Sequence, residues 1–145
     1  MKTLDGIVEK GSGVASPNLH HVKHLIEERT GLSDLVDGTL NVRIEGCYFV
    51  TANATISKEE YDKIEGIKLQ RCRIGGLRAL VMRPETHEQG TAPGATRLEL
   101  MCTVRLRDHL HLEDGDKVSV ELEGDDAWWN GAVQPALPPD AWQSL

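Results

Sequence analysis

Apolar and polar residues alternate over most of this 145-residue chain and follow a helical spacing over only a few stretches, which predicts mainly short strands. Residues 4–9 alternate and predict a first strand, which is followed by the stretch GSGVAS. Ser16 is then a favourable N-cap, with Pro17 at the first helical position and Gly31 as a C-terminal stop. Between them, apolar residues recur at helical spacing, at Leu19, Val22, Leu25 and Ile26. An amphipathic helix is therefore expected over residues 17–30.

The stretch DGTLNVRI at 37–44 begins with an Asp-Gly turn and continues with a period of two. Its apolar residues fall on one face of the expected strand, and its polar residues, Thr39, Asn41 and Arg43, fall on the other. The strand thus presents a hydroxyl and an amide on the same face. The β-rich run GCYFVTA at 46–52 predicts another strand.

A capping signal and a hairpin signal follow. Ser57 and Glu60 have the spacing of a capping box, which places a short helix at about 58–64. Two β-rich runs flank Gly75-Gly76, and glycines supply the positive φ angles that a two-residue hairpin turn requires. A hairpin is therefore expected over residues 67–83.

The last third of the chain completes a small barrel. In order, the expected elements are a mobile loop over 85–96, a strand over 97–103, a helical turn near 105–111, a turn at 113–116 and a strand over 117–122. Together, these elements predict a single domain that is mainly β with short helices, built as a six- to seven-stranded β-barrel over residues 1–123. The tail, 124–145, holds three tryptophans without periodicity and is expected to pack on the domain or at an oligomer interface.

Composition and charge narrow the class of protein. The content of 39% hydrophobic and 27% charged residues is that of a globular domain, and the net charge of −7 argues against nucleic acid as the main partner. The basic run from Lys68 to Arg83 is interpreted as outward positions of the hairpin. The three cysteines show no CxxC spacing and are expected to be reduced.

The location follows from what the chain lacks. No apolar run approaches the roughly 20 residues that cross a bilayer, and the first residues lack the apolar segment of a signal peptide. A cytoplasmic protein without a membrane partner is expected, and the sequence leaves monomer and homodimer open.

Two stretches carry candidate chemistry. The glycines of GSGVA lie between a strand and a helix, where backbone amides can approach phosphate oxygens. The signal matches neither the Walker A pattern nor a full GxGxxG, so a plain strand-to-helix loop remains an equal interpretation. Thr39 and Asn41 offer neutral oxygens that suit Mg²⁺ when phosphates complete its shell, and an outward-facing polar strand is the alternative.

The order and spacing of GSGVAS, a helix, DGTLNV, a hairpin ending in proline, a threonine-containing loop, LEL and VRLRDHLHLEDGDKVSVEL resemble one family. These motifs resemble the archaeal-type CTP-dependent riboflavin kinases over about residues 4–123. The most specific parts are residues 38–41 and 106–116. The resemblance implies a cradle-loop β-barrel that transfers the γ-phosphate of CTP to the 5′-hydroxyl of riboflavin, which gives FMN and CDP.

The resemblance also implies a role for particular positions. Thr39 and Asn41 would hold Mg²⁺, and Glu99 would contact the flavin together with a loop threonine, either Thr91 or Thr86. The nucleotide would contact Gly11, Ser12, Gly13, Val14, Ala15 and Ser16 on one side and Val104, Arg105, Leu106 and Arg107 on the other. No catalytic residue is assigned, because a loose phosphoryl-transfer transition state needs no strong base.

The chain departs from the family pattern at three places. Val14 stands where an acidic residue is expected, Leu35-Val36 replaces an aromatic residue and a proline, and Cys102-Thr103 replaces Ala-Pro. A non-catalytic nucleotide- or flavin-binding module on the same barrel is therefore the alternative function. A DNA-binding regulator of the AbrB type is a third, because LRDHLHLEDGDKVSVEL also resembles those proteins.

Overall fold

A computed structural model gives the fold and describes residues 2–11, 20–61, 65–88, 93–122 and 125–131. The described elements are β1 (Lys2–Glu9), α2 (Lys23–Thr30), β2 (Leu40–Ile44), β3 (Ala54–Ile56), α3 (Lys58–Tyr61), β4 (Ile67–Ile74), β5 (Leu77–Pro84), η1 (Glu85–Glu88), η2 (Pro93–Thr96), β6 (Arg97–Cys102), α4 (Leu106–His109), β7 (Lys117–Leu122) and α5 (Asp126–Asn130).

The strands close into an antiparallel barrel. The strand order is β3-β4-β5-β6-β2-β1-β7, and a further pairing of β4 with β7 closes six of the strands into a ring. One edge of β4 serves two partners, since its first half pairs with β3 and its second half pairs with β7. The expected small barrel of six to seven strands in a single domain is confirmed.

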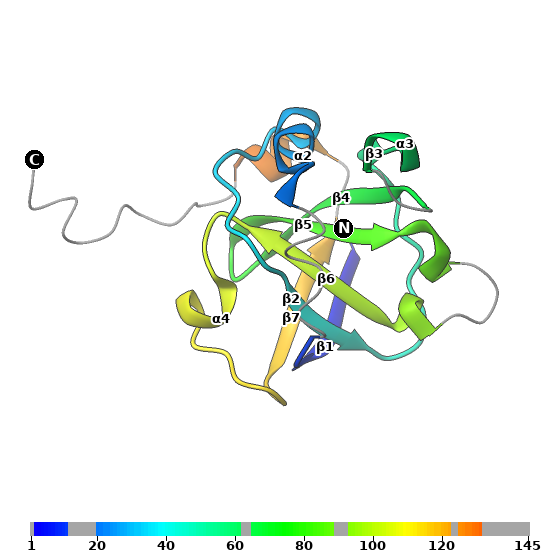
Figure 1. Cartoon of the computed structure of the whole chain (residues 1–145). Coiled ribbons are helices and arrows are strands. Elements are labelled where there is room, and N and C mark those ends of the chain that lie inside the picture. The colour runs from blue at the N-terminus through cyan, green and yellow to red at the C-terminus, as the bar shows by residue number, and fades with distance from the viewer. Residues whose placement is uncertain (1, 12–19, 62–64, 89–92, 123–124, 132–145) are drawn as a thin grey trace, which may run out of the picture.

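Two apolar cores follow from the alternation along the strands. The barrel interior holds one face of each strand, for example Leu40, Val42 and Ile44 of β2. A second core lies outside the barrel, where outward residues of β4, β5 and β6 such as Leu80 and Met101 pack against helices. Figure 1 shows α2, α3 and α5 gathered on this same side of the barrel.

Several local predictions are confirmed. The hairpin of β4 and β5 turns at Gly75 and Gly76, whose φ angles are +57° and +77°. Gly31 ends α2 in the left-handed conformation, and its N–H donates to the carbonyl of Glu27. The capping box is formed as well, since the backbone N–H of Glu60 donates to Ser57 Oγ and that of Ser57 donates to Glu60 Oε1.

The prediction of a strand over 46–52 is wrong, because this segment pairs largely with side chains instead of another strand. The backbone N–H of Val50 donates to the Glu88 carboxylate, and that of Thr51 donates to Gln70 Oε1. The N–H of Tyr48 donates to the carbonyl of Ala95 in η2. Side-chain acceptors thus satisfy backbone groups that a ladder would otherwise use.

Two further predictions need correction. The helix expected over 17–30 is interrupted, because residues 21–22 form a turn and α2 begins only at Lys23. His21 Nε2 lies 2.7 Å from the carbonyl oxygen of Tyr61, so a tertiary contact replaces the continuous helical pattern. The loop expected over 85–96 contains two 3₁₀ helices, η1 and η2. The expected helix start at Ser16 and Pro17 lies outside the described residues.

The tryptophans of the tail meet the basic hairpin. Trp129 of α5 is buried in the second core, and its indole N–H donates to the carbonyl of Cys72. The guanidinium groups of Arg71 and Arg78 lie over its ring, and that of Arg73 lies over Trp128. The interpretation of the basic run as outward hairpin positions holds for Arg71, Arg73 and Arg78, but it is wrong for Arg83, which is buried. Trp142 lies outside the described residues.

The cysteines and helices complete the description. Cys72 and Cys102 are buried and Cys47 is exposed, and all three are free thiols. Among the described helices, none has the length and apolarity to span a membrane.

Candidate active site

Polar side chains form a row across the outer face of β1, β2 and β6. Asn41 of β2 pairs with Glu9 of β1 on one side and with Glu99 of β6 on the other, so the three residues lie side by side. Their strand neighbours Val8, Val42 and Leu98 point into the barrel, which leaves the row on the outside. Thr39 joins the row, because its hydroxyl lies 3.5 Å from Glu99 Oε2.

The first glycine after β1 packs directly on this row. A Cβ atom added to Gly11 would lie 2.1 Å from Nδ2 of Asn41 and 3.5 Å from its Oδ1. A side chain at position 11 would therefore displace the end of the Asn41 side chain. The amide oxygen of Asn41 is directed away from Gly11 and remains available as a ligand.

Glu99 lies where the polar row meets the second apolar core. Its neighbours are Met82 on β5 and Met101 on its own strand, both members of that core. Burial raises the pKa of the Glu99 carboxyl, although the hydrogen bond from Thr39 and the charges of Arg83 and Arg97 act to lower it. A half-buried carboxyl that is only weakly bonded is suited to receive N–H or O–H donors from a ligand.

Tyr61 feels the charge of Glu99 and was not predicted from the sequence as a site residue. The pKa of its phenol is raised by burial and, to a smaller extent, by the charge of Glu99. Its ring stacks on His21, with 5.7 Å between the ring centroids. No spacing in the sequence connects Tyr61 to Glu99.

A small pocket lies at the other end of the Thr39 segment. The pocket, of about 100 Å³, brings residues 36–40 together with residues 104–107. Two of the departures from the family pattern meet here, because the N–H of Val36 donates to the carbonyl of Cys102 at 3.0 Å. Arg107 donates to Asp114 Oδ1 at 2.6 Å, which ties this segment to the turn before β7.

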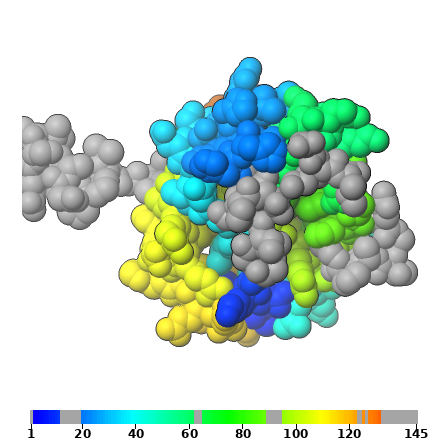
Figure 2. All heavy atoms as spheres, viewed as in Figure 1, coloured from blue at the N-terminus to red at the C-terminus, as the bar shows by residue number. Residues whose placement is uncertain are grey.

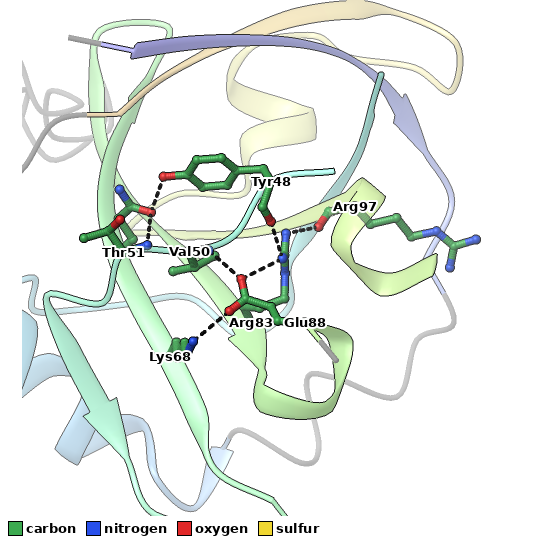
Figure 3. Close-up of polar contacts among 8 residues, drawn as sticks. Tyr48, Val50, Thr51, Lys68, Arg83, Glu88 and Arg97 are labelled. Atoms are coloured by element: carbon green, nitrogen blue, oxygen red, sulfur yellow. Dashed lines mark hydrogen bonds and ion pairs between the residues drawn. The ribbon is translucent and has the colours of Figure 1, made fainter. Parts of the chain in front are cut away.

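A buried ionic network holds the segment that leads into β6 (Figure 3). Arg83, at the end of β5, donates to the carbonyls of Tyr48 and Arg97 and to the carboxylate of Glu88. Glu88 also accepts from Lys68 at 2.8 Å. Burial lowers the pKa of Arg83, while the charge of Glu88 opposes that shift. The network was not predicted, because its members are far apart in sequence.

The donor set suits a magnesium ion only in the presence of phosphate. Thr39 and Asn41 provide two neutral oxygens, and hard cations accept such ligands when anionic oxygens complete the shell. No cluster of three or more His, Cys, Asp or Glu side chains that could hold a metal occurs within the described ranges. The residues present therefore fit a metal that arrives with a nucleotide.

Comparison with known proteins identifies the family. The sequence profile of CTP-dep_RFKase, described as "Domain of unknown function DUF120", matches residues 8–122. The chain belongs to this family. The resemblance inferred from the motifs is thereby confirmed.

Curated proteins named riboflavin kinase are similar along most of this chain. The riboflavin kinase of Methanocella arvoryzae is 30% identical over 117 residues, which cover 78% of this chain and 52% of the relative. The riboflavin kinase of Archaeoglobus fulgidus is 34% identical over 125 residues, which cover 77% and 50%. The chain thus spans about half the length of these relatives.

The structure brings together most of the described positions singled out by the likeness to riboflavin kinases. Gly11, Thr39, Asn41 and Glu99 lie on one outer face, and the pocket joins Thr39 to residues 104–107. In Figure 2, atoms of β1, β6, α2 and the segment after β6 border the same face of the molecule. Thr86 is exposed on η1. The remaining predicted contacts, residues 12–16 and Thr91, lie outside the described residues.

Proposed function

We propose that this protein is a CTP-dependent riboflavin kinase, which transfers the γ-phosphate of CTP to the 5′-hydroxyl of riboflavin and releases FMN and CDP. The observation that carries the proposal is the convergence of Gly11, the Thr39 and Asn41 pair and Glu99 on one outer face. Membership in the family and the similarity to proteins named riboflavin kinase support it.

The proposed nucleotide site combines the backbone at Gly11 with the pocket between residues 36–40 and residues 104–107. Backbone N–H groups after Gly11 would donate hydrogen bonds to phosphate oxygens, and residues 104–107 would contact the rest of the nucleotide. The proposed flavin site lies at Glu99, whose carboxylate would accept hydrogen bonds from the ring. Thr86 and Thr91 stay alternative partners for the flavin.

Magnesium would be held by the Thr39 hydroxyl and the Asn41 amide oxygen, where it would neutralise phosphate charge. In the transfer, the 5′-oxygen of riboflavin forms a bond to the γ-phosphorus as the bond to the bridging oxygen breaks. CDP leaves with that electron pair, and the hydroxyl proton passes to solvent. The chain's contribution is to align the two substrates and exclude competing water.

The test is chromatographic detection of FMN after incubation of the purified protein with riboflavin, Mg²⁺ and either CTP or ATP. FMN formation with CTP supports the proposal. FMN formation with ATP alone would mean that the protein is a riboflavin kinase that uses ATP as its phosphate donor. If folded protein forms no FMN with either nucleotide but binds riboflavin, the non-catalytic module is favoured. Retention of duplex DNA at low salt would instead favour the AbrB-like alternative.

Variants of the metal pair sharpen this test. Thr39→Ala and Asn41→Ala should each reduce Mg²⁺-dependent turnover by roughly a hundredfold or more, since metal-mediated charge neutralisation contributes several kcal/mol. Thr3→Ala, which removes an exposed threonine at the start of β1, is the matched control and should retain activity. Equal activity of all three variants would contradict the assignment of the metal site.

A further inference from the structure

The outer face of β1, β2 and β6 carries an arginine pair in addition to the polar row. Arg43 and Arg97 are paired across β2 and β6, two residues along the strands from Asn41 and Glu99. Because side chains two apart on a strand share a face, both arginines lie beside the proposed metal and flavin positions. Their side chains are 59% and 61% exposed.

The position of the Arg97 guanidinium follows from strand order. Arg97 is on β6 and Glu9 is on β1, with β2 between them. Even so, Arg97 Nε lies 3.1 Å from Glu9 Oε1, and Arg43 Nε lies 3.7 Å from Glu9 Oε2. Since neighbouring strands are about 4.8 Å apart, these side chains must meet over the outer surface of β2. Glu9 pairs with Asn41, so the two side chains lie on the same outer face.

The backbone of Arg97 is fixed while its side chain is not part of the buried network. Arg83 donates to the carbonyl of Arg97 at 2.7 Å. Figure 3 shows the side chain of Arg97 extending away from that network. A held backbone with an exposed guanidinium is suited to meet a ligand from solvent.

The charges favour an anion as that ligand. Two guanidinium groups share the carboxylate of Glu9, and together they carry more N–H donors than one carboxylate can accept. Exposed ion pairs of this kind contribute little free energy, whereas guanidinium binds phosphate through two parallel hydrogen bonds. A phosphoryl group can therefore replace Glu9 as the partner of Arg97.

We propose that Arg97, with Arg43 beside it, is a further catalytic residue whose guanidinium binds the phosphoryl group as it moves from CTP to riboflavin. Glu9 holds the guanidinium over β2 until that group arrives. Arg97 exchanges no proton and stabilises the negative charge on the oxygens of the transferred group, which ends as the phosphate of FMN. The inference rests on the proposed kinase function.

The distinguishing experiment compares two flavins that differ by this phosphate. Equilibrium titration, followed by quenching of flavin fluorescence, gives the affinities for FMN and for riboflavin. Arg97→Gln should weaken FMN binding by about tenfold or more and leave riboflavin binding unchanged, because only FMN carries the charged group. Turnover with CTP should fall by about tenfold or more. Arg97→Lys keeps the positive charge but lacks the planar guanidinium, so its FMN affinity and its turnover should lie between those of the wild type and of Arg97→Gln.

Two further variants separate this role from a general effect of charge. Glu9→Gln removes the competing carboxylate and should tighten FMN binding, opposite in sign to Arg97→Gln. Arg73→Gln is the matched control, since it removes one arginine charge from β4, where Arg73 lies over Trp128. The control should leave the ratio of the two affinities unchanged.

The outcomes separate the inference from the function beneath it. If the wild type forms FMN but Arg97→Gln changes neither turnover nor the FMN-to-riboflavin affinity ratio, Arg97 has no catalytic role and the kinase stands. If Arg97→Gln weakens the binding of FMN and of riboflavin equally, the inference is also overturned. If the wild type forms no FMN, a selective loss of FMN affinity still supports the phosphate site, whereas binding of neither flavin overturns both proposals.

Discussion

At the scale of single residues, the burial that suits the Glu99 carboxyl to its proposed contact with the flavin also lowers the stability of the folded protein. Its pKa is raised above the ordinary 4.5 because burial disfavours the carboxylate. The unfolded chain therefore releases this proton at a lower pH than the folded chain does. The resulting loss of stability is absent below pH 4.5. It grows as the pH rises from there to the pKa of Glu99 in the folded protein, and it is complete above that pKa.

Glu99→Gln should therefore leave stability at pH 7 unchanged or raise it by up to about 1 kcal/mol, while it lowers riboflavin affinity. Urea denaturation of both proteins at pH 4 and pH 7 measures the first effect, and flavin fluorescence measures the second. The stability difference should be smaller at pH 4. A variant that is less stable at pH 7 and binds riboflavin normally would contradict both roles.

Gly11 and Asn41 offer a second test at this scale. Gly11→Ala would bring a Cβ atom to 2.1 Å from Asn41 Nδ2, and the end of that side chain would have to shift. We expect less than about 1 kcal/mol of lost stability, but a loss of turnover as large as in Asn41→Ala. Adding Gly11→Ala to Asn41→Ala should have little further effect, because both act on one amide. Steady-state kinetics of the three variants provide the comparison.

At the scale of elements, the Arg83 network determines how the segment before β6 is held. The network connects the end of β5, the segment around Tyr48, η1 and the first residue of β6. Arg83→Leu leaves the Glu88 carboxylate without its buried partner and should lower the free energy of unfolding by about 3–5 kcal/mol. Urea denaturation provides the measurement.

Lys68→Met is the matched control, because it removes the other, partly exposed partner of Glu88 and should cost at most about 1 kcal/mol. Hydrogen exchange of η1 should increase in Arg83→Leu and remain nearly normal in Lys68→Met. Equal losses in the two variants would mean that the network does not depend on the buried arginine.

Much of the element plan could be predicted from local pattern, and the exceptions have a common cause. The alternation of β2, the turn at Gly75-Gly76 and the capping box at Ser57 are each specified by adjacent residues. The segment 46–52 has the composition of a strand, but acceptors from Gln70 and Glu88 take its N–H groups. Such distant contacts leave no signal in the spacing of one sequence.

The candidate site divides in the same way. The sequence indicated Thr39, Asn41 and Glu99 through motif and strand face, and the structure places them in one row. The sequence could not indicate that Glu9 belongs to that row, because strand order brings it beside Asn41. Periodicity specifies the face of a residue but not the neighbours across it.

At the scale of the whole molecule, α5 belongs to the second core. Trp129→Ala should lower the free energy of unfolding by about 3–5 kcal/mol, because it removes a large buried side chain that contacts Arg71, Arg78 and the carbonyl of Cys72. Trp128→Ala is the matched control and should cost less, since Trp128 is only partly buried. Chemical denaturation measures both variants.

The division of the chain into a barrel of residues 1–123 and an extension of 124–145 remains a prediction. If the barrel folds without the extension, a chain ending at 123 should keep its β-rich circular dichroism spectrum and lose stability by about the amount found for Trp129→Ala. A fully unfolded shortened chain would make α5 an obligatory part of the domain.

The pairing of β1 with β7 has a consequence for how the protein is made. Lys2 lies opposite Leu122, so the ring of strands joins the beginning of the barrel sequence to its end. During synthesis, the hairpin of β4 and β5 can form as soon as it leaves the ribosome, and β1 can pair with β2. The other edge of β1 must wait until β7, at the end of the barrel sequence, has been translated. Until then, β1 exposes an unpaired edge, and the nascent chain is most vulnerable to aggregation in that interval.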